Sequence, residues 1–178
     1  MEAAIQLLIV GLILLAVLGF VGSLHQSSYE KTAAIVLQSN LVAISSVLES
    51  DFNKIGYHAG KPAIQRADSV FSFLSDLHNS GTVCTVQYYK SAKLSTQDQG
   101  LCRKVSGENS IYSYVHVSKL NFAYFDSTGI PTSTLAAIRS VNVMLELQNP
   151  QLLDPTYKYS DSTAIPSLFW TKTFYIQN

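Results

Sequence analysis

The sequence predicts an α+β protein, in which one long N-terminal α-helix packs on a C-terminal antiparallel β-sheet domain. Three observations predict this class. Residues 3–24 form an apolar run interrupted only by Gln6 and Ser23, and residues 28–55 contain neither Gly nor Pro. The remainder alternates stretches rich in Val, Phe and Tyr with turn-forming residues, a pattern typical of strands.

The helix is expected to cover residues 1–55 and to be followed by a β-rich globular head over residues 56–178. Its first half, residues 1–24, is apolar and suits a membrane or a filament core. The 22 residues of the run reach ~33 Å as a helix, enough to cross the hydrocarbon core of a bilayer. The second half, residues 25–55, is amphipathic and is expected to pack on the head.

A cleaved signal peptide fits the run poorly, because the apolar stretch is too long and no basic residue precedes it. An ordinary membrane anchor fits the length, but anchors usually carry Lys or Arg on the cytoplasmic side, and the first basic residue here is Lys31. A basic leader removed before Met1 would explain that absence.

The second half of the helix predicts one packed face. Its apolar residues recur at helical spacing, and the opposite side carries mainly Gln, Ser, Glu and Asn. The helix is expected to stop at Lys54-Ile55-Gly56, where a glycine can adopt the left-handed cap. The residues expected to pack on the head are Leu37, Leu41, Ile44, Leu48, Phe52 and Ile55.

The strands expected after the helix are bounded by turns and polar loops. Val141, Val143, Leu145 and Leu147 alternate with polar residues, Met144 being the exception, which predicts a strand buried on one face. A polar loop is expected around residues 95–100, and a proline-containing loop before the last strand. The other predicted strands are residues 70–77, 82–90, 111–117, 119–125 and 167–176.

The two cysteines, Cys84 and Cys102, do not have zinc-site spacing. Folding the chain back about Lys93 places one directly opposite the other, and an apolar N-terminus implies export to a compartment where disulfides persist. The sequence therefore predicts a Cys84–Cys102 disulfide, which would constrain the unfolded chain by roughly 3 kcal/mol.

Composition argues against several functions. The chain has 12 basic and 12 acidic residues and no net charge, so neither a nucleic-acid footprint nor a polybasic membrane patch is expected. The four histidines have no metal-site spacing, no serine lies in an acylase motif, and no phosphate-binding glycine loop occurs. We expect no catalytic residue, metal or cofactor, and no specific nucleic-acid partner.

Several local motifs, taken in order, resemble those of type IV pilin-like proteins. Residues 5–10 look like the mature pilin N-terminus, in which a Glu precedes a Leu-Leu-Ile-Val-like run. Residues 51–57 look like the Asp-x-x-x-x-Gly-Tyr element that ends the long helix in PilW-like minor pilins and in the J-type pseudopilins of type II secretion. The strand motifs that follow in that group's order are residues 88–89, 101–104, 120–126 with Gly129, and 138–143.

The chain departs from the family at two places. The family's acidic fifth residue is replaced by Ile5, the aligned position holds Gln6, and Glu2 is the only acid in the segment. Either Glu2 takes over the pairing with an N-terminal amine, or the subunit enters its filament without that pair. Because an unpaired carboxylate in an apolar core is costly, pairing with the amine of Met1, its own or a neighbour's, is favoured. The family's helix-breaking proline is also missing.

The resemblance implies a structural subunit of an extracellular type IV pilus-like filament on a bacterial cell surface, with a precursor anchored in the inner membrane. Its partners would be copies of itself and other pilin-like subunits. The alternatives are a minor pilin or pseudopilin of a secretion or pilus machine, a monomeric membrane-anchored surface domain that binds a partner, and, least favoured, a secreted enzyme. The residues expected to form the assembly helix are Met1, Glu2, Gln6, Leu7, Leu8, Gly11, Ile13, Leu14, Ala16, Gly19 and Gly22.

Overall fold

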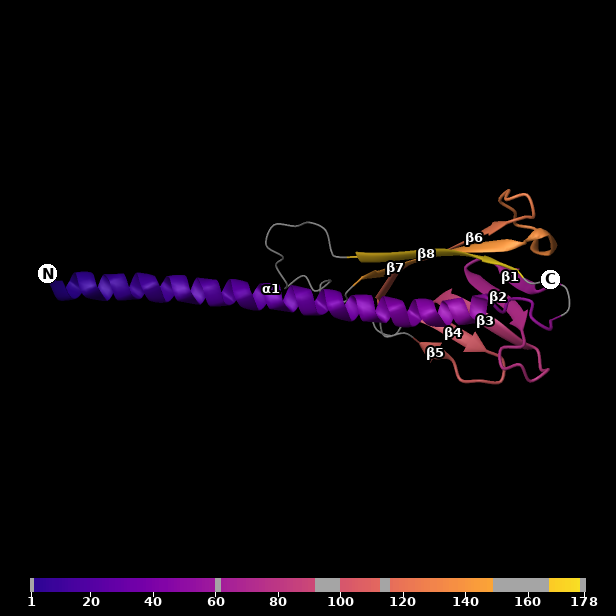
Figure 1. Cartoon of the computed structure of the whole chain (residues 1–178), viewed down its shortest axis with the longest axis horizontal. Helices are drawn as coiled ribbons and strands as arrows, with labels where there is room; N and C mark the ends of the chain where they lie inside the picture. The colour runs from indigo at the N-terminus through magenta and orange to yellow at the C-terminus, as the bar shows by residue number, and fades with distance from the viewer. Residues whose placement is uncertain (1, 60–61, 92–99, 113–115, 149–166, 177–178) are drawn as a thin grey trace. The chain divides into compact units, whose positions relative to one another are not determined.

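The computed structural model contains one long α-helix, eight β-strands and a short 3-10 helix among its described residues, which are 2–59, 62–91, 100–112, 116–148 and 167–176 (Figure 1). Met1, most of the polar loop, the proline-containing loop and part of the predicted strand 111–117 lie outside these ranges. The elements are α1 (Glu2–Phe52), β1 (Ile64–Ala67), β2 (Val70–Ser75), β3 (Cys84–Lys90), β4 (Leu101–Val105), β5 (Ile111–Tyr112), β6 (His116–Phe125), η1 (Leu135–Ala137), β7 (Ser140–Gln148) and β8 (Ser167–Tyr175).

Helix α1 runs without a break from Glu2 to Phe52, through all three of its glycines. It ends three residues before the predicted boundary, and turns follow as far as His58. Gly56 has a φ of 81°, the left-handed conformation expected of it. Its N–H donates to the carbonyl of Leu74 at 3.0 Å, so the chain leaves the helix already bonded to β2.

By their internal contacts the residues divide into two compact units, residues 1–36 and residues 37–178. The dividing point lies inside α1 rather than at its end. The last turns of the helix therefore belong with the head, and only the preceding part forms a unit of its own.

The described residues of the head form two antiparallel sheets. One has five strands in the order β1-β2-β3-β4-β5, and the other has three in the order β6-β7-β8. This confirms the α+β class, and the predicted strands over β2, β3, β6, β7 and β8 are confirmed as strands. Strand β1 was not predicted, because its four residues alternate neither cleanly nor for long enough.

The C-terminal end of α1 joins the two sheets. Phe52 is fully buried, and Figure 1 shows β6–β8 and β3–β5 on different sides of the last helical turns. Aromatic rings from both sheets surround Phe52 and merge them into one core. Their centroid distances from the Phe52 ring are 5.3 Å for Phe71, 5.5 Å for Phe73 and 5.4 Å for Tyr88 on the larger sheet, and 6.3 Å for Phe122 and 5.1 Å for Phe174 on the smaller.

The residues expected to pack on the head lie in or against this core. Leu37, Leu48, Phe52 and Ile55 are buried, and Leu41 and Ile44 are partly buried against them. The alternation predicted for β7 is confirmed. Its buried side chains are those of Val141, Val143, Leu145 and Leu147, whereas Met144 is 39% exposed.

Candidate functional site: an exposed apolar helix and its anchor

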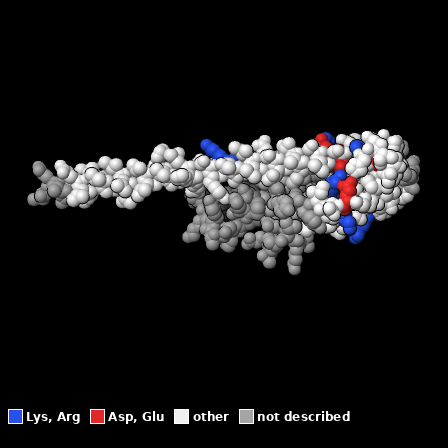
Figure 2. Space-filling model, turned by 90° about the horizontal axis from the view of Figure 1, so that it is seen from below, with Lys and Arg blue, Asp and Glu red and all other residues white. Residues whose placement is uncertain are grey.

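The apolar half of α1 is a continuous exposed apolar surface. Every large apolar side chain from Ile5 to Leu24 is exposed, over a range from 42% at Val21 to 74% at Leu7. The segment contains no charged residue, and outside the grey atoms Figure 2 shows the visible face at this end of the helix without blue or red. Contiguous apolar surface of this size marks contact with a membrane or with protein.

The helix has the length and composition needed to cross a membrane. A signal sequence near an N-terminus has the same two properties. The described part of the segment thus has the build of a membrane anchor or of a signal sequence.

The predicted assembly residues lie along this segment. A Cβ placed on Gly11, Gly19 or Gly22 would meet no described atom within 4 Å, so each glycine leaves an open notch on the helix surface. Such notches let a neighbouring helix approach closely. Met1 and the side chain of Glu2 lie outside the described structure, so the predicted pairing of Glu2 with an amine stays a prediction.

Asp51 anchors the other end of the helix in the five-stranded sheet. Its carboxylate is buried because position 51 lies on the same helical face as Leu48 and Ile55. Oδ2 accepts hydrogen bonds from the Tyr88 hydroxyl at 2.5 Å and from Arg103 Nε at 2.6 Å, and Oδ1 accepts one from Arg103 Nη2 at 3.2 Å. The charge of Asp51 is therefore matched by a two-point contact with a guanidinium.

Burial raises the pKa of the Tyr88 hydroxyl, and its contact with Asp51 raises it further. The hydrogen bond to Asp51 raises the pKa of Arg103. Both Tyr88 and Arg103 consequently remain protonated hydrogen-bond donors over the physiological pH range.

Two more contacts hold the last turns of the helix and the residues after it. Lys172 Nζ on β8 lies 2.7 Å from Glu49 Oε2, which joins α1 to the three-stranded sheet. Lys54 Nζ donates to the Leu77 carbonyl at 2.6 Å, on the side of the five-stranded sheet. The helix end is thus tied by side chains to both sheets.

Asp76 organises the turn after β2 and the chain that leaves the helix. Its side chain is fully buried and accepts hydrogen bonds from the N–H groups of Ser80 at 3.0 Å and Gly81 at 2.8 Å. Nδ1 of the His58 ring lies 3.3 Å from Oδ2 of Asp76. Desolvation raises the pKa of Asp76, but the two backbone donors and the contact with His58 together lower it more, so the pKa of this carboxyl lies below its ordinary value.

No protein-family model, curated protein or solved structure matches the chain. What the geometry establishes is an α+β protein with one long, exposed, apolar N-terminal helix whose last turns are fastened between two antiparallel sheets. The described residues contain no group of three His, Cys, Asp or Glu side chains able to hold a metal ion.

The predicted disulfide is wrong. Both cysteines are free thiols, and the β3–β4 register places Cys102 opposite Tyr89. The same register, which pairs Val86 with Val105, would place Cys84 opposite position 107, five residues past Cys102. That offset is ~17 Å along a strand, whereas a disulfide requires Cα atoms within ~7 Å. Because the offset is odd, the two side chains also point to opposite faces of the sheet.

The partners of Asp51 were not predicted from the sequence. One feature of the sequence does indicate that Asp51 has a partner. Asp51 shares its helical face with the apolar residues that were expected to pack on the head, and a carboxylate on a buried face requires a cationic partner. The sequence does not show that this partner is Arg103, since the two lie 52 residues apart.

Proposed function

We propose that this chain is a structural subunit of an extracellular type IV pilus-like filament, assembling through its apolar N-terminal helix. The exposed apolar surface from Ile5 to Leu24 supports the proposal, as does the sequence resemblance stated above. Identical helices bundled along a filament axis would cover that surface, and a head-to-tail contact that does not close makes a helical fibre.

The observation that carries the proposal is that exposed apolar side chains continue beyond the reach of a bilayer. Ile35, Val36, Val42 and Val47 are 66%, 52%, 61% and 46% exposed. From Ile5 to Val47 the helix rises ~63 Å, about twice the ~30 Å thickness of a hydrocarbon core. A bilayer covers one part of this stretch, and the other part suits a protein partner.

A groove beside the second half of the helix adds support. It has a volume of about 500 Å³ and lies between α1 and strands β4 and β5. Exposed Val47 and Ile111 line it, and the Asp51–Arg103 pair also borders it. An apolar wall beside a charged pair already satisfied within the chain suits contact with another subunit.

The second candidate is a minor pilin or pseudopilin of a secretion or pilus machine, which the residue 51–57 motif favours. This protein would enter short assemblies with other pilin-like subunits rather than build long fibres from its own copies. A monomeric membrane-anchored surface domain is the third candidate. All three candidates would begin as a precursor anchored in the inner membrane. They differ in what covers the exposed apolar side chains of residues 35–47.

Electron microscopy of material sheared from the cell surface tests the proposal directly. We expect fibres in which this chain is the main component, identified by mass spectrometry of the purified fibres. Cells that lack this chain and form the same fibres would contradict the proposal. Fibres in which the chain is present only at trace levels would favour the minor-subunit alternative.

The native N-terminus provides an independent test. Mass spectrometry of the protein from cells is expected to show a methylated amine at an N-terminus close to the start of the apolar run, after removal of a leader. An N-terminus that retains a basic anchor ahead of Met1 would contradict the pilin-like interpretation.

A further inference from the structure

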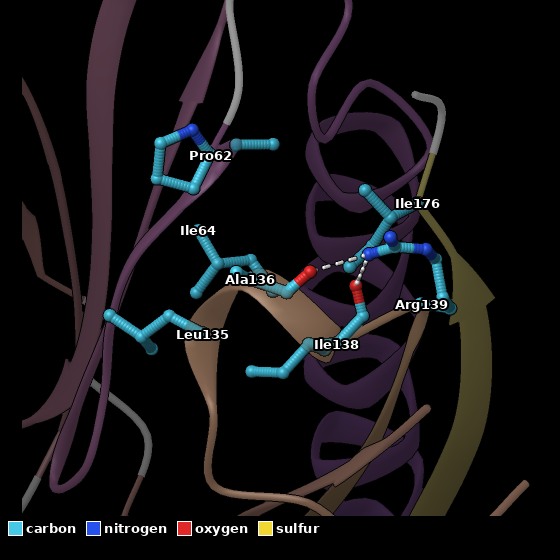
Figure 3. Close-up of a pocket in the computed structure, with 8 residues that line it drawn as sticks. Pro62, Ile64, Leu135, Ala136, Ile138, Arg139 and Ile176 are labelled. Atoms are coloured by element: carbon cyan, nitrogen blue, oxygen red, sulfur yellow. Dashed lines mark hydrogen bonds between the residues drawn. The ribbon is translucent and has the colours of Figure 1, made fainter. Parts of the chain in front are cut away.

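A small pocket of about 220 Å³ lies where β1, η1 and the end of β8 meet. Figure 3 shows its apolar side chains converging from these elements, with one charged group, Arg139, at the side. The volume is below the ~300 Å³ lower limit of pockets for drug-sized ligands, so the occupant must be small. The apolar lining residues include Pro62, Ala63, Ile64, Leu135, Ile138 and Ile176.

Arg139 is fixed in place at this pocket. Its N–H donates to the Phe125 carbonyl at 2.8 Å, and its own carbonyl accepts the N–H of Ile176 at 2.9 Å. Nη1 donates to the carbonyls of Ala136 and Ile138, each at 2.9 Å, as the dashed lines in Figure 3 mark. The direction of the guanidinium is thereby set before any ligand arrives.

Part of the guanidinium remains available. The group has five N–H donors, and the two carbonyl contacts use those of Nη1, which leaves Nε and Nη2 without a partner among the described residues. None of the ion pairs formed by described residues involves Arg139. A cation at the edge of an apolar pocket, without a carboxylate partner in the described structure, favours an anionic ligand with an apolar body.

We infer that this pocket binds a short-chain aliphatic carboxylate, whose alkyl chain contacts Ile64, Ile138 and Ile176 and whose carboxylate accepts hydrogen bonds from Nε and Nη2 of Arg139. The planar guanidinium matches a carboxylate at two points. The inference is independent of the proposed function, because the pocket belongs wholly to the head.

Methyl NMR of the full chain in detergent micelles tests the inference, with isoleucine methyl groups labelled and sodium pentanoate as the probe. The methyl signals of Ile64, Ile138 and Ile176 are expected to shift and saturate together, while that of Ile55, buried in the core, stays unchanged. Arg139→Gln is expected to weaken binding about tenfold or more, because it removes the charge-assisted hydrogen bonds. Glutamine keeps an N–H donor for the carbonyls of Ala136 and Ile138, and an unchanged melting temperature checks the fold.

Ligand controls separate the two parts of the site. Pentan-1-ol, which lacks the charge, and acetate, which lacks the chain, are each expected to bind at least tenfold more weakly than pentanoate. N-acetylvaline represents a peptide C-terminus, and tighter binding of this compound than of pentanoate would overturn the assignment to a short-chain aliphatic carboxylate in favour of a peptide C-terminus. Equal binding of pentanoate and pentan-1-ol would overturn the role of Arg139.

A second variant keeps the test decisive if Arg139→Gln does not fold. Ala136 is exposed and lines the pocket, so Ala136→Phe is expected to fill it and abolish the pentanoate shifts without disturbing the core. Undiminished pentanoate binding by Ala136→Phe would overturn the inference.

Discussion

At the scale of single residues, Asp51 shows how a buried charge fastens the helix to the head. Its side chain is 7% exposed and that of Arg103 is 15% exposed, so solvent screens the pair weakly. A matched pair of this kind contributes little net free energy compared with apolar residues, but removing one partner leaves the other charge buried and unpaired. The residue therefore specifies where the helix attaches more than it adds stability.

We predict that Arg103→Met lowers the free energy of unfolding by about 3 kcal/mol, because it leaves the Asp51 carboxylate buried without its cation. Urea unfolding of the full chain in detergent, followed by the fluorescence of Trp170, measures this change. The double variant Asp51→Asn, Arg103→Met is expected to recover part of the loss. A loss below about 1 kcal/mol for Arg103→Met alone would show that the pair behaves like an exposed one.

Asp76 contributes to the pH dependence of stability. Its folded pKa lies below the ordinary aspartate value of about 3.9, so below about pH 4 the unfolded chain binds more protons than the folded one. Its contribution is fully present above that range and is lost as the pH falls through the folded pKa. We predict that the urea midpoint falls from about pH 5 to about pH 3, and that Asp76→Asn makes this fall shallower. An unchanged slope in Asp76→Asn would contradict the assignment.

Neither cysteine is expected to be crosslinked. Dithiothreitol should leave the unfolding midpoint unchanged, and alkylation of the unfolded, unreduced protein should add two adducts to its intact mass. In the folded protein Cys84, which is partly exposed, is expected to react before Cys102, which is fully buried. A single protein species without adducts would show that the thiols pair after all.

At the scale of elements, α1 joins two different environments within one continuous helix. Its first half exposes apolar residues on every side, and its last turns bury one face against the two sheets. Local periodicity encodes both behaviours, which is why the helix, its two halves and the glycine after its end were predictable. The sheets were less predictable, since β1 and the β3–β4 register depend on neighbours distant in sequence.

We predict that Ile13→Asp abolishes filament assembly while the head stays folded, because a carboxylate near the middle of an apolar bundle or bilayer costs ~2.5–3.5 kcal/mol. Fibre yield by electron microscopy and the fluorescence of Trp170 report the two effects separately. Ile130→Asp, at an isoleucine of the head that is also exposed, serves as the matched control and should assemble normally. Normal fibre yield from Ile13→Asp would count against an apolar helical core.

At the scale of the whole molecule, the division at residue 36 predicts that the head is an independent folding unit. The residues that close its core, from Leu37 to Ile176, all lie after that point. The apolar segment from Ile5 to Leu24 contributes no residue to this core, and its exposed side chains suit contact with a membrane or with protein.

A chain lacking residues 1–30 is expected to be soluble and to unfold cooperatively, since it keeps the whole second unit. A chain lacking residues 1–45 also loses Leu37, Leu41 and Ile44 and is expected to be less stable by several kcal/mol. Urea unfolding followed by the fluorescence of Trp170 compares the two. Equal stability of both chains would show that the helix face from residue 37 to 44 does not close the core.

The sequence by itself determined the class of this protein, the apolar and amphipathic halves of its helix and the buried face of β7, because each depends on the periodicity of residues close together in the chain. Only the tertiary structure decided that there are two sheets joined at Phe52, that Cys84 and Cys102 point to opposite faces, that Arg103 pairs with Asp51 and that Arg139 borders an apolar pocket. These features depend on which distant segments meet, and a periodic pattern specifies the face of an element without specifying its neighbour.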